Sequence, residues 1–292
     1  MSTYSQHQRI RIRFRALSRL TVAQVRQMYA LYQQHVDNAT FETFLRDLSK
    51  KSGAILASRQ RDGRVMGFST LAAVHLKVDG QQVRGLFSGD AIVDPSYRAG
   101  QELVEAVHTH LLIERLKHPL TPFYWFVAAK GYGAYQQVTS RFGGHYPDVE
   151  GGGEHYRRIA EVYCQQFFPH AFDRARMLLD FGEDCVRLKA NATNGTHGPS
   201  DARDRAFFER VNPTWRLGTE VLCLGAFDYS KVMRSLIDVT LNWARRHRPG
   251  TPASTTGLDV NERIDQLIPA SSAHRRRLGV GQAWKRTKAS RA

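Results

Sequence analysis

A short stretch in the first half of the chain has residue types that suit the binding of a negatively charged group. Ile92-Val-Asp-Pro-Ser-Tyr-Arg98 leads into Ala99, Gly100 and Gln101, and the whole stretch joins an apolar run to a long helical pattern. A turn at the start of a helix leaves backbone N–H groups unpaired beside the positive end of the helix dipole. Such a turn can bind a diphosphate with little help from side chains.

Two side chains near this stretch could transfer protons. Asp90, in Phe87-Ser-Gly-Asp90, is either a general base or a surface aspartate in a turn. Tyr135, in Lys130-Gly-Tyr-Gly-Ala-Tyr135, is either a functional phenol or a core tyrosine at the edge of a sheet. Lys130 and Tyr132 could contact a phosphate or cap the end of a strand.

The sequence predicts neither a metal site nor a disulfide framework. His75, His108, His110 and His145 lack the spacing of metal ligands. The three cysteines, Cys164, Cys185 and Cys223, contain no Cys-x-x-Cys pair and leave one residue over in any pairing, so we expect them to be reduced and buried. The chain begins with polar and basic residues and has no apolar run of membrane-spanning length, which predicts a soluble cytoplasmic protein without a transmembrane segment.

Apolar periodicity predicts the elements that must position these groups. Alternation over Arg9–Arg15 predicts a strand with arginines on its wet face. Helical spacing follows over 21–32 and 40–49, and then β-type runs over 54–58, 65–77 and 83–93 predict an antiparallel meander. The last predicted elements of this half are a helix over 96–117, a buried strand over 123–129 and a short helix over 133–142. The strands on either side of the long helix should be parallel, because a helical crossover connects them.

This order, β-α-α-β-β-β-α-β-α, resembles the Gcn5-related N-acetyltransferase (GNAT) fold over residues 10–147. Ile92-Val-Asp-Pro-Ser-Tyr-Arg98 is similar to the V-x-P-x-Y-R stretch with which that family leaves its fourth strand for the pyrophosphate loop. The resemblance implies an α/β (α+β) fold whose mixed sheet carries a central crossover helix. It also implies that Asp90 is a general base beside the acceptor and that Tyr135 protonates the departing thiolate. The residues implied to bind the thioester donor are Ile92, Val93, Arg98, Ala99, Gly100 and Gln101.

The loop departs from the family pattern, which reads Arg/Gln-x-x-Gly-x-Gly/Ala. This chain has Arg98-Ala-Gly-Gln-Glu-Leu103, with neither glycine in its expected place. Gln101 and Leu103 would crowd a backbone that must approach phosphate closely, and Glu102 adds an anion. Either Gly100 serves in a loop shortened by one residue, or the donor is not CoA. An acyl carrier protein, which is acidic, would suit both this loop and a basic protein surface.

Gly151 to Gly153 predict a linker between two domains. The first, over 9–148, is the GNAT-like acyltransferase domain, and the second, over 154–250, is expected to be mainly helical and to cover the acceptor side. Within the second domain, helical runs are expected over 156–168, 172–181, 203–211 and 231–247, with a polar loop over 194–200 and a short strand over 220–225. Residues 251–292 are expected to form a basic, largely disordered linker and tail.

Most of the net charge of +15 lies at the two ends. Residues 1–15 carry four arginines and residues 274–292 carry seven basic residues, and neither stretch has an acidic residue. These ends could bind an acidic carrier protein, non-specific nucleic acid or an anionic surface, or they could simply keep the chain soluble.

Two functions agree with these observations. The first is an acyltransferase that moves an acyl group from an acyl-CoA or acyl-carrier-protein thioester to an amine or hydroxyl acceptor, without a metal. The second is a catalytically silent binding protein of the same fold, whose basic termini bind nucleic acid or membrane. The enzyme needs an open slot lined by Asp90 or Tyr135 and amide donors at 99–101, whereas the binding protein needs only a continuous basic face.

Overall fold

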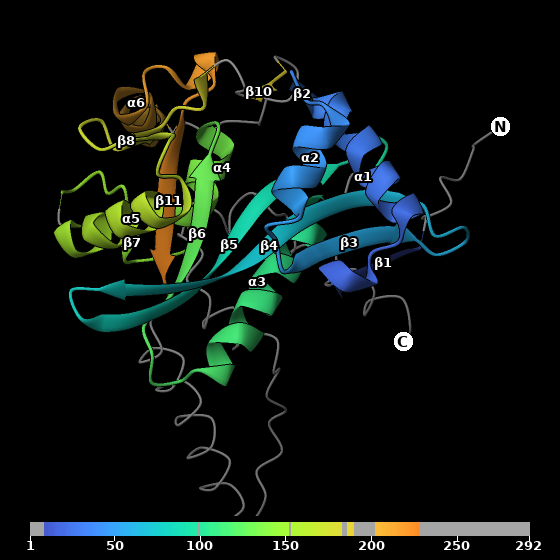
Figure 1. Ribbon diagram of the computed structural model, residues 1–292, viewed down its shortest axis with the longest axis horizontal. Coiled ribbons are helices and arrows are strands. Elements are labelled where there is room, and N and C mark those ends of the chain that lie inside the picture. Colours follow the sequence, from blue (N-terminus) through green and yellow to red (C-terminus); the bar gives the residue numbers. More distant parts are fainter. Residues whose placement is uncertain (1–8, 98–99, 152, 183–185, 190–201, 228–292) are drawn as a thin grey trace, which may run out of the picture. The chain divides into compact units, whose positions relative to one another are not determined.

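Elements of the first half follow one another in the order that the sequence predicts. The computed structural model describes residues 9–97, 100–151, 153–182, 186–189 and 202–227. Of these, Ser140–Gly143 belong to a second unit, and all the others form one unit around a mixed sheet (Figure 1). Its strand order is β1-β3-β4-β5-β6-β11-β9-β8, and β7 pairs with β11. A separate pair is formed by β2 and β10.

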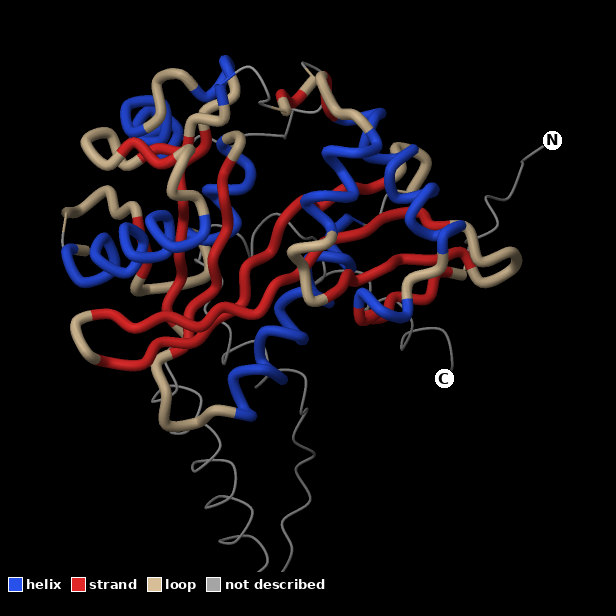
Figure 2. The backbone as a smooth tube through the Cα atoms, viewed as in Figure 1, coloured by secondary structure: helices blue, strands red, loops and turns tan. Residues whose placement is uncertain are grey.

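Figure 2 shows how strands and helices alternate along the chain. The strands are β1 (Ile10–Ala16), β2 (Val36–Asp37), β3 (Gly53–Arg59), β4 (Val65–Val78), β5 (Gln81–Val93), β6 (Phe123–Ala129), β7 (His145–Tyr146), β8 (Phe172–Asp173), β9 (Leu178–Leu179), β10 (Arg187–Leu188) and β11 (Glu220–Ala226). The helices are α1 (Val22–His35), α2 (Phe41–Leu48), α3 (Gly100–Lys117), α4 (Tyr132–Thr139), α5 (Glu154–Phe167) and α6 (Ala202–Val211).

Local sequence explains where the first elements begin and turn. α1 follows Thr21, whose hydroxyl accepts a hydrogen bond from the Gln24 amide at 3.2 Å while the Gln24 side chain accepts one from the Thr21 amide at 3.1 Å. Between β4 and β5, Asp79 (φ 49°) and Gly80 (φ 86°) both have the left-handed backbone that a two-residue hairpin requires. The predicted antiparallel meander is confirmed by the ladders β3–β4 and β4–β5.

The predicted parallel pairing of β5 with β6 is also confirmed, but it stops early. It runs from Arg84 opposite Phe123 to Ser88 opposite Val127, although both strands continue beyond these residues. At the same level, Gly89 and Asp90 of β5 lie opposite Thr70 alone on β4, which is a β-bulge. A Cβ atom at residue 89 would collide with the Thr70 hydroxyl, so a larger residue there would displace the Thr70 side chain. The two parallel strands therefore separate next to Asp90.

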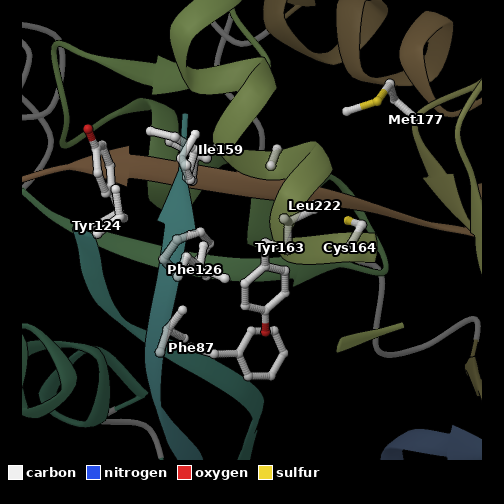
Figure 3. Close-up of a cluster of buried hydrophobic side chains, with 14 of the residues drawn as sticks. Phe87, Tyr124, Phe126, Ile159, Tyr163, Cys164, Met177 and Leu222 are labelled. Carbon is white, nitrogen blue, oxygen red and sulfur yellow. The ribbon is translucent and has the colours of Figure 1, made fainter. Parts of the chain in front are cut away.

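Two clusters of buried side chains lie on one face of the sheet. The first lies under α1 and α2 and includes Phe44 and Phe68, and the second lies under α5 and includes Phe126 and Tyr163. In Figure 3 the ring of Tyr163 faces that of Phe126, and the ring centroids are 4.7 Å apart. Phe68 and Val74, six residues apart on β4, contact different clusters from the same face, because side chains of a strand alternate. α3 packs on the opposite face (Figure 1).

The second half differs from expectation in how its elements are used. α5 and α6 confirm two of the expected helices, and β11 confirms the expected strand. β11 pairs antiparallel with β6, so the chain after the glycines completes the sheet of the first half. The helix expected over 172–181 is wrong: β8 and β9 pair there, because the Asp173 side chain accepts a hydrogen bond from the Arg176 amide and Met177 has φ 56°. The expected helix over 231–247, most of the loop over 194–200 and the tail lie outside the described residues.

Two further expectations concern the described residues directly. Cys164 and Cys223 are free and buried, as expected, and Cys185 lies outside the described part. No helix in the described part of the chain is both long and apolar enough to span a bilayer.

A chain that ends at residue 150 should not fold stably. It would lose β11, the antiparallel partner of β6, and it would expose the rings of Phe87 and Phe126 that α5 covers. We expect the shortened chain to aggregate or to lose cooperative thermal unfolding, which circular dichroism and size-exclusion chromatography can measure against the full chain. A soluble, cooperatively unfolding product would contradict this and would support an independent domain over 9–148.

Candidate active site

The turn that leads from β5 into α3 is organised by Asp94. Its carboxylate accepts hydrogen bonds from the Ser96 amide at 2.9 Å and the Ser96 hydroxyl at 2.6 Å, and lies 3.3 Å from an Arg64 nitrogen. Burial opposes the charge on Asp94, but the Ser96 hydrogen bonds and Arg64 outweigh it and lower its pKa. The approach to α3 is therefore held in one conformation up to Tyr97.

The residues expected to bind the donor lie along this approach. Ile92 is buried in the cluster under α1 and α2, and Val93 is the half-buried last residue of β5. Gly100 opens α3 and Gln101 lies in its first turn, whereas Arg98 and Ala99 lie outside the described residues. The four described residues of this group, Ile92, Val93, Gly100 and Gln101, therefore lie on either side of the junction between β5 and α3.

Glu102 also lies in the first turn of α3. It is exposed, and its carboxylate accepts a hydrogen bond of 2.7 Å from the Tyr97 hydroxyl. Burial and this hydrogen bond raise the pKa of Tyr97. A carboxylate in the first turn is favourable for the helix dipole, but it repels a second anion at the same place. Compared with a turn that has no acidic residue, this one is less suited to a diphosphate.

Tyr135 is packed as a core residue. Its side chain is fully buried on α4, its ring lies 5.6 Å from that of Phe208 and 6.2 Å from that of Phe207 on α6, and burial raises its pKa. Its hydroxyl has no hydrogen-bond partner among the described residues. Tyr132 is buried against the same helix, with Phe208 at 6.2 Å. The role of Tyr135 as an acid stays a prediction, since in this conformation α6 separates it from solvent.

Asp90 belongs to a charged cluster at the place where β5 and β6 separate. Lys130, directly after β6, donates a hydrogen bond of 3.2 Å to Asp90 on β5 and lies 3.8 Å from Glu220 at the start of β11. Lys130 is 24% exposed, Asp90 14% and Glu220 8%, so all three are largely removed from water. We call Asp90, Lys130 and Glu220 the charged triad.

The two carboxylates of the charged triad are not equivalent. Asp90 accepts a hydrogen bond from Lys130, whereas Glu220 accepts none from the described residues. Burial raises the pKa of Glu220 to about 7, against the attraction of Lys130 and with the repulsion of Asp90 and Asp47. For Lys130, burial opposes the charge, but Asp90 and Glu220 outweigh it and hold its pKa well above the ordinary value. Glu220 is therefore a carboxylate that can change protonation near neutral pH.

Groups from α1, α2 and β4 surround the charged triad. Tyr32 of α1 is buried, and burial together with Asp90 raises its pKa. Lys51 pairs with Asp47 at 3.0 Å, and Gly89 lies between Lys51 and Thr70. The hydroxyl of Thr70 is buried and has no partner among the described residues. The carboxylates of Asp47, Asp90 and Glu220 thus outnumber the ammonium groups of Lys51 and Lys130. This excess of negative charge favours a proton or a bound cation near Glu220.

Sequence reasoning missed Glu220 and left Lys130 undecided. Glu220 stands 90 residues after Lys130 and 130 after Asp90. A charged residue at the head of the apolar run Val221-Leu-Cys-Leu224 was the available signal. It becomes informative only when β11 is known to pair with β6. Among the described residues, no cluster of histidine, cysteine or acidic side chains could hold a metal ion.

Comparison with known proteins finds similarity in fold. No protein-family model matches the sequence, and no curated protein matches it. One similar solved structure is a GNAT-family N-acetyltransferase from Escherichia coli in complex with CoA. The two sequences are 15% identical, the match covers 47% of this chain and 71% of that chain, and the TM-score is 0.33. Another is N-myristoyltransferase from Saccharomyces cerevisiae with bound myristoyl-CoA. Here the sequences are 14% identical, the match covers 44% of this chain and 30% of that chain, and the TM-score is 0.32.

A third similar structure is a protein from Enterococcus faecalis called a probable N-acyltransferase: 16% identity, 47% of this chain, 32% of that chain and a TM-score of 0.34. The chain thus spans about a third of the length of the Enterococcus and Saccharomyces proteins. The mixed sheet with a central crossover helix that the sequence predicts is confirmed by the strand order and by the parallel pairing of β5 with β6.

Glu220 should make the protein less stable as the pH rises through neutrality. Its pKa is raised in the folded state, so its contribution is fully present below the unfolded value of 4.5 and is lost as the pH passes about 7. Glu220→Gln removes this loss, and its stability relative to the wild type should increase between pH 5 and pH 8 by on the order of 1–3 kcal/mol. Urea unfolding at several pH values measures the difference.

Glu161 provides the matched control for this measurement. It is a buried glutamate of the same unit, but its carboxylate pairs with Arg158 and Arg174, so Glu161→Gln should destabilise at pH 8. If Glu220→Gln also destabilised the protein at pH 8, Glu220 would be a fully paired ion-pair partner of Lys130. The inferred difference between the two carboxylates of the charged triad would then be wrong.

Proposed function

We propose that this protein is an acyltransferase that moves an acyl group from a thioester to an amine or hydroxyl acceptor. One observation carries the proposal: the charged triad lies where the parallel strands β5 and β6 stop pairing. Separated strands leave backbone groups and space for an extended thioester, and polar side chains at that point can act on the acceptor. The donor is the thioester of CoA or of an acyl carrier protein.

The donor thioester would lie against the bulge of β5. A bulge leaves the backbone of the extra residue outside the regular ladder. In this chain the bulge is Gly89–Asp90, and it faces the gap in pairing beyond Ser88 and Val127. A backbone N–H at this position would polarise the thioester carbonyl and stabilise the oxyanion that forms on attack.

Glu220 is the best placed group to act as the base. Asp90, the base expected from the sequence, is held by Lys130, whereas Glu220 has no hydrogen bond among the described residues and a pKa near 7. An amine acceptor arrives as an ammonium ion and gives one proton to Glu220. Its nitrogen lone pair then attacks the carbonyl carbon, the C–N bond forms and the C–S bond breaks. The second nitrogen proton passes to the departing thiolate, and Glu220 returns its proton to water. In this scheme Asp90 is a positioning residue that holds Lys130.

Glu220→Gln should lower kcat/KM by about 100-fold or more, the usual contribution of a general base. In the wild type, kcat/KM should rise as the pH increases through about 7, because Glu220 must lose its proton. The variant should lack that rise. Thioester cleavage, followed with a thiol reagent over a panel of acyl-CoAs, acyl carrier thioesters and amines, gives both measurements.

Two further variants are needed for comparison: Asp90→Asn, which tests the alternative base, and Glu161→Gln, which is the control. Glu161→Gln should keep the pH profile, because Glu161 lies on α5 and pairs with arginines there. Glu220→Gln could retain both the wild-type kcat/KM and its rise with pH, while Asp90→Asn loses them. That result would show that Asp90, and not Glu220, is the base. No thioester turnover by the wild type, together with salt-sensitive nucleic-acid retention, would favour the silent binding protein instead.

A further inference from the structure

Apart from the seven basic residues in 274–292, positive charge is concentrated in the first 64 residues. This stretch has twelve basic and four acidic residues, whereas residues 65–273 have 23 of each and are neutral overall. All twelve basic residues lie in the described residues 9–64, which comprise β1, α1, β2, α2 and β3, so the excess charge belongs to the folded unit. A charge asymmetry of this size indicates an anionic partner.

Four exposed arginines gather at one end of the sheet, which we call the basic end: Arg9, Arg11, Arg61 and Arg64. Ile10 pairs with Arg59, and the Gln60 amide donates to the Arg9 carbonyl at 2.8 Å, so the start of β1 lies beside the β3–β4 hairpin. The start of β4 in turn lies beside the end of β5, because the Asp94 amide donates to the Met66 carbonyl at 2.8 Å. The hairpin between β3 and β4 is seen at the right of Figure 1.

The charges of the basic end are largely uncompensated. Arg9 and Arg11 form no ion pair within the described residues. Arg61 lies 3.6 Å from Asp62, but Asp62 is held by Arg59, whose hydrogen bonds lower the pKa of Asp62 to about 2. Arg64 lies 3.3 Å from Asp94, whose carboxylate already serves the turn before α3. Three of the four guanidinium groups are therefore available to a partner.

The basic end borders the proposed entrance for the donor. β1, β3, β4 and β5 are neighbours, and at 4.7–4.9 Å between strands their ends span about 15 Å. An α-helix with its side chains is about 10–12 Å across, so the basic end is wide enough to contact a helix. It is wider than a single diphosphate group. The turn Asp94–Tyr97 lies at its border, and just beyond it Glu102 places an exposed carboxylate where a diphosphate would bind. The basic end thus offers a footprint for a folded anionic partner, next to a turn that is poorly suited to phosphate.

We propose that the basic end docks an acidic carrier protein that presents its acyl group as a phosphopantetheine thioester. The carrier's acidic helix would lie across the ends of β1, β3 and β4, and its prosthetic arm would pass the Asp94 turn to the gap between β5 and β6. This proposal rests on the acyltransferase function and names its donor. A single-stranded nucleic acid fits less well, because it favours open aromatic faces, and the ring of Phe14 on β1 is stacked on His110 at 4.4 Å.

The experiment compares three donors that share one acyl group: a bacterial acyl carrier protein thioester, acyl-CoA and acyl-pantetheine, which has neither phosphate nor protein. The variant combines Arg9→Gln, Arg11→Gln and Arg61→Gln and leaves Arg64 to hold the turn. The control combines Lys77→Gln, Lys117→Gln and Arg157→Gln, which removes the same charge at exposed positions on β4, α3 and α5. We expect the variant to lose about tenfold or more in kcat/KM for the carrier thioester and to stay within about twofold on acyl-pantetheine.

Added salt should lower kcat/KM for the carrier thioester, as the arginine substitutions should, because both weaken the attraction between the arginines and the acidic carrier. Raising the salt concentration from about 50 to about 200 mM should lower the wild-type kcat/KM for the carrier thioester and leave that for acyl-pantetheine unchanged. Equal losses for acyl-CoA and the carrier thioester would overturn the proposal, because the arginines would then bind phosphate. A variant that matches the control, or one that loses only RNA retention, would overturn it as well. Wild-type turnover of none of the three donors would instead remove the acyltransferase function itself.

Discussion

The ammonium group of Lys130 holds together the part of the sheet that backbone hydrogen bonds no longer connect. Beyond Ser88 and Val127, β5 and β6 have no ladder between them, yet Lys130 still joins Asp90 on one side of this gap to Glu220 on the other. A largely buried lysine needs at least one carboxylate to keep its charge, and here it has two. The contact therefore explains both why the strands can separate at a defined place and why an additional, incompletely paired carboxylate persists there.

The packing on either side makes this arrangement rigid. One core cluster lies under α1 and α2, the other under α5, and the charged triad lies between them on the sheet. Interiors packed in this way resist displacement of their side chains by even small distances. A carboxylate held by such surroundings cannot easily move towards water, so its protonation state responds instead. The packing around Glu220 thus keeps its carboxylate away from water, and this burial raises its pKa.

The sides that the proposed reaction assigns to the donor and to the acceptor differ in their electrostatics. On the acceptor side, carboxylates outnumber ammonium groups in a largely buried space. At the end of the sheet beside α3, exposed arginines predominate, and the exception is Glu102 in the first turn of the helix. The arginines lie on β1 and the β3–β4 hairpin, whereas the charged triad lies at the gap between β5 and β6 and at the start of β11, so the two charge patterns occupy different strands near the same end of β5.

Local sequence signals are sufficient to predict the elements of the first half, because periodicity, caps and two-residue turns act within a few residues. The Thr21 cap, the Asp79-Gly80 turn and the alternation of β1 are all local. The sequence also predicts that β5 and β6 run parallel, because a crossover helix allows little else. The same local reasoning was wrong for 172–181, where the turn at Asp173 and Met177 outweighed an apolar pattern that also suits a helix.

The composition of the candidate site depends on how distant segments of the chain pack together. Asp90 could be singled out from its neighbours in the chain, but its pairing with Lys130 and Glu220 depends on three strands whose positions are set by long-range packing. Tyr135 shows the converse, since its place on α4 was predictable while its burial by α6 was not. The reason is physical: hydrogen-bond periodicity is written in neighbouring residues, whereas burial and charge proximity arise when distant segments share one sheet.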